Sequence, residues 1–193
     1  MQKINLNSRS IIEFLSALPD TRRKAGRRHS QEHILLIVLM AIMSGYHVYR
    51  GIGDFIERNK ADLIKYLKPS KGRLPTFYTI RRVLIGLDFE AFSKAFYEWS
   101  KQYICISEGE WLSIDGKALG GTVESLSDEY QNFVNLVSVF VSTQKMVLAN
   151  AKVINSKQSE IPVVRQLIQS LDLEGNVFTI DALHCQKKQW MKL

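Results

Sequence analysis

The stretch Trp111-Leu-Ser-Ile-Asp115-Gly-Lys-Ala-Leu119 has the pattern of a short buried strand that ends on a carboxylate and a glycine. The pattern returns later in the chain as Phe178-Thr-Ile-Asp181-Ala. In both phrases an apolar residue, a hydroxyl residue and isoleucine come directly before the aspartate. An aspartate just past a strand is often only a turn or helix-capping residue, so it is the repetition that indicates a site.

The alternation of side chains across a strand gives the two phrases a shared geometry. Ser113 and Asp115 fall on one face of their strand, and Thr179 and Asp181 fall on one face of theirs. If the two strands are parallel neighbours in register, the carboxylates lie roughly 5 Å apart, which is one strand spacing. Carboxylates that close repel each other unless they share a proton or bind cations, and magnesium favours such oxygen-rich sites.

The segments between the two phrases indicate two more strands and one helix. Gly120-Gly121 predicts a turn after the first strand, and Thr143–Lys145 predicts a turn of the hairpin type. We expect strands over Phe133–Ser142 and Met146–Ile154. A helix over Ser159–Leu171 should follow, with its proline tolerated in the first turn.

This order of elements predicts the fold class α+β. A helical crossover after the third strand makes the fourth strand parallel to the first, and the repeated aspartate phrase favours a place directly beside it. We therefore expect an N-terminal all-helical domain over residues 1–105. An incomplete ribonuclease H-like domain over residues 106–193 should follow, with three antiparallel strands, a crossover helix and a fourth strand.

The positive charge is concentrated in the first part of the chain. The 193 residues include 26 Lys+Arg and 19 Asp+Glu, a net charge of +7. Residues 1–110 hold 18 basic and 11 acidic side chains, whereas residues 111–193 hold eight of each. An excess confined to one part is expected if that part meets a polyanion, although a basic surface also serves solubility.

The remaining features favour a cytoplasmic protein without a membrane partner. Cys105 and Cys185 have neither disulfide nor metal spacing, and we expect reduced thiols. No signal peptide opens the chain. The longest apolar run, Ile34–Met43, has ten residues and is too short to span a bilayer.

Two basic segments of the helical part are candidate DNA contacts. The first is a loop whose basic residues either bind phosphates or are simply solvated: Arg22, Arg23, Lys24, Arg27 and Arg28. The second is a helix over Phe77–Ile85, capped by Thr76, with Arg81 and Arg82 facing outward. Together with a short helix predicted over Ala61–Leu67 and the turn between them, this helix resembles a helix-turn-helix motif. A plain helical bundle explains the same pattern about as well.

Several phrases together resemble the DDE transposases of bacterial insertion sequences, and most nearly the H-repeat-associated group. They are Ile114-Asp-Gly-Lys117, Lys157-Gln-Ser-Glu-Ile161 and Thr179-Ile-Asp-Ala-Leu-His-Cys-Gln186. Phe14-Leu-Ser-Ala-Leu-Pro-Asp20, followed by two arginines, is similar to the start of the DDE-associated domain that these proteins carry. The resemblance covers about residues 8–188.

The resemblance implies a transposase that depends on Mg2+ or Mn2+ and cuts and joins double-stranded DNA at the ends of its own element. Asp115 and Asp181 match the family's first two metal-binding acids. Lys117 could contact phosphate or be an ordinary surface lysine. His184 and Gln186 match the second motif without a role that we can derive. Whether the chain forms a homo-oligomer does not follow from the sequence.

The family's third acid, a glutamate on a helix well beyond the second aspartate, has no counterpart in this sequence. The chain stops twelve residues after Asp181, and Gln189–Leu193 does not continue the family's pattern. We therefore expect a C-terminally truncated copy that is inactive alone. Glu160 opens the crossover helix, where an acid also suits the helix dipole, and it is the weaker candidate for a metal ligand.

Three other interpretations remain open on the sequence alone. The chain could be a non-catalytic DNA-binding regulator or remnant of the element. It could be another metal-dependent nuclease of ribonuclease H-like fold, such as a resolvase. It could also be the unfolded product of a decayed gene.

Overall fold

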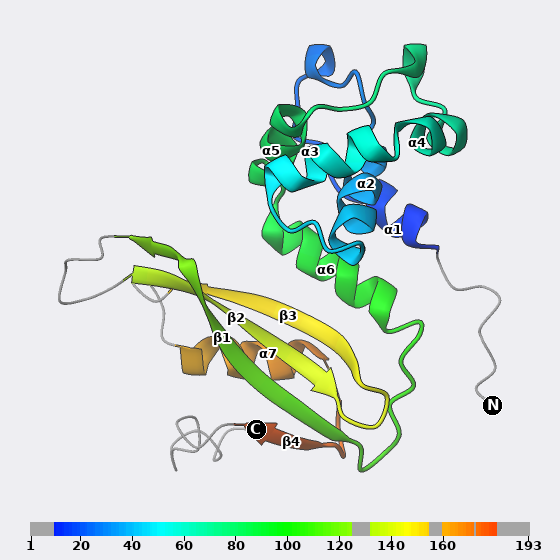
Figure 1. Cartoon of the computed structure of the whole chain (residues 1–193). Coiled ribbons are helices and arrows are strands. Elements are labelled where there is room, and N and C mark those ends of the chain that lie inside the picture. The colour runs from blue at the N-terminus through cyan, green and yellow to red at the C-terminus, as the bar shows by residue number, and fades with distance from the viewer. Residues whose placement is uncertain (1–9, 125–131, 155–159, 172, 181–193) are drawn as a thin grey trace. The chain divides into compact units, whose positions relative to one another are not determined.

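The computed structural model describes residues 10–124, 132–154, 160–171 and 173–180 (Figure 1). The chain divides into two compact units, the first extending to Phe92 and the second running on from Ser93. The first unit is helical, and the second contains a mixed sheet with a helix, so the predicted mixture of helix and sheet is confirmed. No helix among these described residues is long and apolar enough to cross a membrane.

The first part of the described chain consists of helices, including those predicted over Ala61–Leu67 and Phe77–Ile85. They are α1 (Ile11–Ser16), η1 (Lys24–Gly26), α2 (Gln31–Met43), α3 (Tyr49–Arg58), α4 (Lys60–Leu67), η2 (Ser70–Gly72), α5 (Phe77–Ile85) and α6 (Phe89–Ser100), the last of which crosses the division between the units.

Short polar side chains set the starts of several helices. The Ser10 hydroxyl accepts a hydrogen bond from the Glu13 amide at 3.2 Å, and the Glu13 carboxylate accepts one from the Ser10 amide at 3.0 Å. This reciprocal pair satisfies two amides at the start of α1 that lack partners within the helix. Thr76 occupies the N-cap position of α5, as predicted. Its side chain does not cap the helix, however, because the hydroxyl lies 3.4 Å from the Thr79 hydroxyl and accepts no hydrogen bond from a backbone amide.

The core of the helical unit forms around α2, which is apolar on nearly all sides. Its Ile34 and Ile37 side chains are at most 1% exposed, and α1, α3 and α5 all contact the helix. Gly53 lets α3 and α5 approach closely, because a Cβ at this position would lie 3.3 Å from the Cβ of Phe77. The inner face of α5 therefore packs closely against the unit, and its Ile80 side chain is fully buried.

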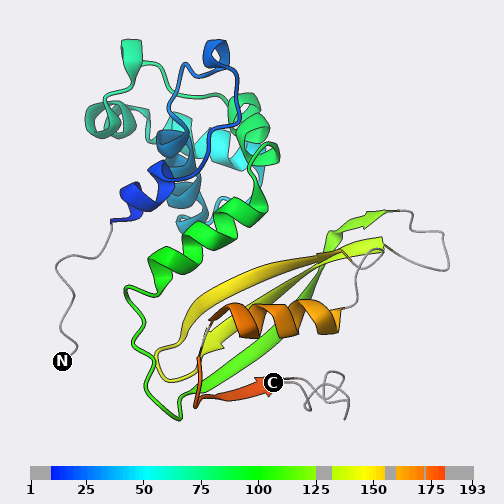
Figure 2. The ribbon, with the colours of Figure 1, turned by 180° about the vertical axis from the view of Figure 1, so that it is seen from behind.

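The second unit contains a four-stranded sheet in the order β3-β2-β1-β4 (Figure 2). Its elements are β1 (Trp111–Glu124), β2 (Asn132–Val141), β3 (Met146–Ile154), α7 (Glu160–Leu171) and β4 (Val177–Ile180). The first three strands are antiparallel, and β4 pairs in parallel with β1. The prediction that the fourth strand lies beside the first is therefore confirmed.

One face of the sheet packs against α7 and forms the core of this unit. Leu112, Val137 and Val139 are fully buried, and they cluster with Val164 and Leu167 of α7. Alternation across β1 therefore places Ser113 and Asp115 on the opposite face, as the sequence predicts. Both views show α7 against one side of the strands.

The predicted turn at Gly120-Gly121 is wrong, because β1 continues through both glycines to Glu124. The pairing of β1 with β2 is regular as far as Leu119 and resumes, with a shift of register, at Glu124. Glycines in a strand often mark such an irregularity, and here the pairing with β2 prevails over their preference for turns.

Candidate functional site

Asp115 lies within β1, directly opposite Ser138 of β2. Its side chain is exposed, and it makes no hydrogen bond or ion pair with the part of the chain that the structure describes. Lys117 is two residues further along, so it shares the face of Asp115 and is also exposed. None of the described residues therefore competes with a cation for this carboxylate, and an ammonium group lies on the same face of the strand.

A set of hydroxyl groups joins β1 and β4 just before Asp115. Thr179 donates a hydrogen bond to the Ser113 hydroxyl at 3.0 Å and also lies 3.3 Å from the Leu112 carbonyl oxygen. The Ser113 hydroxyl in turn lies 3.2 Å from the Ser142 hydroxyl. The register runs from Trp111 opposite Val177 to Ile114 opposite Ile180. These contacts confirm that the two hydroxyl residues of the repeated phrase share one face.

The second half of the predicted acidic site lies outside the described residues. This concerns Asp181 and, beyond it, His184 and Gln186 of the second motif. Glu160 is the first residue of α7, but its side chain also lies outside the description. Whether Asp115 and Asp181 meet therefore stays a prediction.

The chemistry of the described part suits a hard divalent cation without completing a site for one. Asp115 offers an exposed carboxylate, and hydroxyl groups lie near it on β1, β2 and β4, namely those of Ser113, Ser138 and Thr179. Hydroxyls are oxygen donors like those that magnesium prefers. Among the described residues, no three His, Cys, Asp or Glu side chains gather closely enough to hold a metal ion. A metal centred on Asp115 would need ligands from elsewhere.

The basic loop at residues 22–28 has two kinds of side chain. Arg22 is bound to Asp20 through two hydrogen bonds of 2.9 and 2.8 Å, and its side chain is only 10% exposed. Arg27 donates to the carbonyl oxygens of Arg22 and Asp20 at 2.8 and 2.7 Å. Both arginines therefore brace the loop, although the Arg27 side chain is still 43% exposed. The other members of the predicted cluster, Arg23, Lys24 and Arg28, are exposed as well.

Two groups beside this loop, Asp20 and His29, have pKa values that their surroundings lower. The hydrogen bonds from Arg22 lower the pKa of Asp20 below its usual value of 3.8. Burial, with further repulsion from Arg28 and Arg22, lowers the pKa of His29 below its usual value of 6.5. The Arg22 side chain also donates to the His29 carbonyl oxygen at 3.0 Å. The loop thus favours an ionised aspartate and a neutral histidine.

A hollow of about 580 Å³ lies between this loop and the connection from α4 to α5. Arg28 and His29 line it on one side, and Lys68 and Pro69 line it on the other. Asp20 and Glu32 also line the hollow, so its charges are mixed.

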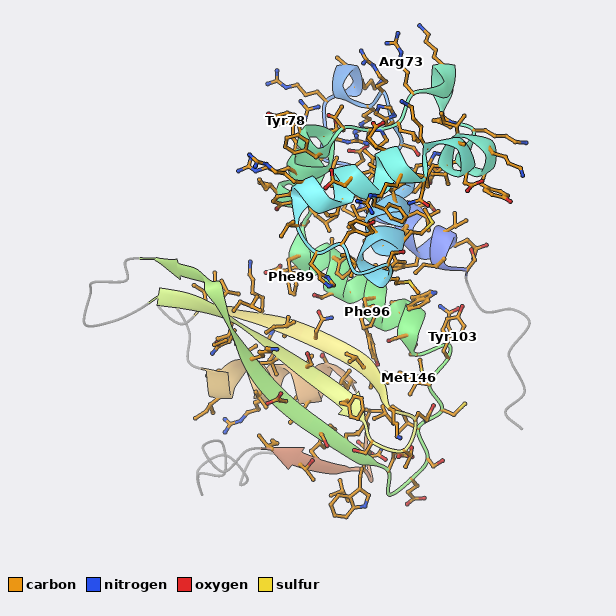
Figure 3. All side chains as sticks on the ribbon, viewed as in Figure 1. Arg73, Tyr78, Phe89, Phe96, Tyr103 and Met146 are labelled. Carbon is orange, nitrogen blue, oxygen red and sulfur yellow. The ribbon has the colours of Figure 1, made fainter. Side chains whose placement is uncertain are left out.

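Helix α5 presents a second basic surface. Arg81 and Arg82 are exposed, as predicted, and make no hydrogen bond or ion pair through their side chains within the described ranges. Tyr78 and Ile85 flank them on the same face and are 71% and 61% exposed. With Thr79, these four residues line an open hollow of about 460 Å³. Figure 3 labels Tyr78 on the outer side of α5 and Arg73 in the segment that leads into the helix.

Sequence reasoning did not single out the basic connection before α5 as a site. Lys68, Lys71 and Arg73 are all exposed there. The sequence does contain a signal, because no acidic residue occurs between Leu63 and Leu87. Tyr78 and Ile85 were missed because an apolar residue on an amphipathic helix is expected to face inward.

Comparison with known proteins gives the family. The family described as DDE_Tnp_1-associated matches residues 12–100, from α1 to the end of α6. Proteins named "Putative transposase YncI" in two strains of Escherichia coli are 32% and 31% identical to this chain over 182 residues, or 94% of its length. The protein named "H repeat-associated putative transposase YhhI", also from Escherichia coli, is 27% identical over 179 residues, 93% of this chain.

The chain spans 46% of the length of one YncI protein and of YhhI, and 72% of the other YncI protein. The chain belongs to the H repeat-associated transposases of bacterial insertion sequences.

Proposed function

We propose that this chain acts in the cytoplasm on double-stranded DNA, as part of a transposase that cleaves and transfers strands at the ends of its element. Kinship with proteins named as transposases supports this proposal. The observation that carries it is the parallel register of β1 and β4. The described pairing ends with Ile114 opposite Ile180, and the next residue of the sequence is Asp115 in one case and Asp181 in the other.

Continuation of that register by one residue would bring the two carboxylates to adjacent strands, on the face away from α7. We propose that they hold a Mg2+ or Mn2+ ion, which when bound activates a water or 3′-hydroxyl and stabilises the leaving oxygen. Asp115 would contribute its free carboxylate, and Lys117 would contact a phosphate of the bound strand. The sheet order and the crossover through α7 are what we expect of the opening part of a ribonuclease H-like domain.

Residues 1–105 would bind the DNA on which this site acts. The exposed basic side chains of the helical unit support this role, because each phosphate contact adds affinity that depends on salt. From the predicted set we assign this role to five exposed residues: Arg23, Lys24, Arg28, Arg81 and Arg82. Arg22 and Arg27 are assigned instead to bracing the loop.

Cleavage of DNA tests the catalytic part of the proposal. The chain is incubated with Mg2+ or Mn2+ and a duplex that carries the ends of the element encoding it. Contrary to the expectation of a chain that is inactive alone, we propose that the two aspartates and their metal ion suffice for strand cleavage. Asp115→Asn should then abolish cleavage, and Asp54→Asn, which removes an exposed aspartate of α3, should leave it unchanged. Retained binding without any cleavage would overturn the catalytic proposal and favour a non-catalytic DNA-binding protein. Cleavage that survives Asp115→Asn would exclude Asp115 from the site.

A further inference from the structure

The α4 to α5 segment has an uninterrupted positive charge. Between Leu63 and Leu87 the sequence has six basic residues and no acidic residue. All six are exposed in the structure: Lys65, Lys68, Lys71, Arg73, Arg81 and Arg82. Outside this segment and the 22–28 loop, basic residues of the helical unit have acidic neighbours, as Lys60 and Glu57 illustrate with a separation of 3.6 Å. A polyanion would therefore meet one continuous positive segment here.

The inner and outer faces of α5 are clearly separated. Ile80 and Val83 are 0% and 3% exposed and hold the helix against its neighbours. Tyr78, Arg81, Arg82 and Ile85 follow the spacing of three, four and seven residues that brings side chains onto one face of a helix. Two arginines thus stand between an exposed aromatic ring and an exposed aliphatic side chain.

An exposed face of this composition differs from an ordinary solvated helix face. A solvated face would carry polar residues, whereas Tyr78 and Ile85 leave large apolar surfaces in water. Arginines suit hydrogen bonding to base edges and phosphates, and apolar side chains suit the methyl group of thymine. An α-helix with its side chains is about 10–12 Å across, and the major groove of DNA is about 12 Å wide.

The connection before α5 supplies groups suited to the flanking phosphates. Lys68 and Lys71 both have left-handed backbone conformations, with φ of 45° and 57°, in the tight turns that lead from α4 into η2. Arg73 follows in extended conformation. Figure 3 shows Arg73 projecting from this segment. The turns therefore hold three cations along the chain immediately before α5.

We propose that α5 enters the major groove of duplex DNA with Arg81, Arg82, Tyr78 and Ile85 facing the base edges, while Lys68, Lys71 and Arg73 contact the adjacent phosphates. This inference rests on the proposed function, because it takes DNA as the partner of the helical unit. It goes further by assigning recognition to α5 and its preceding connection.

Binding of fluorescent duplexes by the full chain, measured by anisotropy, tests this assignment. The probes are a 30-base-pair duplex of random sequence and the duplexes that the wild-type chain enriches from that pool. Arg81→Gln with Arg82→Gln should weaken binding to the enriched duplexes about tenfold and lower their preference over the random pool. Lys71→Gln with Arg73→Gln should weaken binding to both probes alike and reduce the dependence on salt by about two phosphate contacts.

Lys94→Gln with Lys145→Gln removes the same charge from exposed positions outside this surface and should change neither probe's affinity by more than about twofold. Tyr78→Ala with Ile85→Ala should lower the preference for enriched duplexes and leave the salt dependence unchanged. Because these side chains are exposed, the circular dichroism of every variant should match that of the wild type.

Two results separate the failure of this inference from that of the proposed function. A wild-type chain that binds neither probe would contradict DNA binding itself. Wild-type binding that the Arg81/Arg82 variant retains in full would overturn the role of α5 alone. A change of oligomeric state in the Tyr78/Ile85 variant, with DNA binding intact, would also overturn it and identify this face as a contact between copies.

Discussion

Ile114 of β1 lies opposite Ile180 of β4 in a parallel pairing, and an aspartate follows each isoleucine in the sequence. The two isoleucines face the side of the sheet that packs on α7, so the next position of β1 belongs to the opposite face. Asp115 is already seen there, free of partners among the described residues. The account of function depends on this relationship and on the hydroxyl groups beside it.

The first prediction concerns the hydroxyl group that joins the two strands. Thr179→Val keeps the shape of the side chain but removes the hydrogen bonds to Ser113 and to the Leu112 carbonyl. We expect a loss of about 1 kcal/mol in the free energy of unfolding, measured by urea denaturation. Thr179→Ser keeps the hydroxyl and should lie closer to the wild type. A valine variant as stable as the serine variant would show that these bonds do not fix the register.

The second prediction concerns the ion pair that braces the basic loop. Asp20→Asn leaves Arg22 charged and nearly buried without its carboxylate, which should lower the free energy of unfolding by about 3 kcal/mol. Asp54→Asn, at an exposed site, should change it by less than about 0.5 kcal/mol. Thermal unfolding of the two variants in parallel measures the difference. Equal stabilities would mean that Arg22 is as free for DNA as its sequence neighbours.

The third prediction concerns the pH dependence that His29 adds to stability. Its pKa is lower in the folded protein than the usual 6.5, so the unfolded chain takes up the proton first as the pH falls. Folding stability is therefore complete above about pH 6.5 and declines below it until the folded histidine also protonates. His29→Gln should remove this decline, as unfolding measured from pH 8 to pH 5 would show. A decline of equal size in the variant would assign it to another group.

Asp20 adds a second decline at lower pH with the same sign. Its folded pKa lies below 3.8, so its contribution is present above that value and is lost as the pH falls further. The decline that belongs to His29 should therefore begin at a higher pH than the one that belongs to Asp20. Asp20→Asn should remove the second decline and leave the first in place.

The sheet could be predicted from the sequence because the strand patterns and the connections between the strands indicate the same arrangement. Residues Met146–Ile154 form the strand that was expected, and the crossover through α7 makes β4 parallel to β1. The repeated aspartate phrase then predicted that β4 lies at the edge of the sheet beside β1. The turn predicted from the glycines at residues 120 and 121 was wrong, because the local preference of glycine for turns is weaker than pairing along a long strand.

Two features of the basic surfaces could not be read from sequence. Arg22 and Arg23 are neighbours of the same type, yet Asp20 binds the first and leaves the second exposed. Only the folded loop decides which guanidinium group the carboxylate reaches. The exposure of Tyr78 and Ile85 also depends on which face of α5 the rest of the unit covers.

Binding of Mn2+, followed by the loss of its free electron paramagnetic resonance signal, tests the central claim most directly. The full chain is compared with Asp115→Asn, Asp181→Asn and the matched control Asp54→Asn. We predict binding by the wild type and the control, and affinity at least about tenfold weaker in each of the other two variants. Wild-type affinity in Asp181→Asn would contradict the account, because it would mean that the two aspartates do not share a metal site.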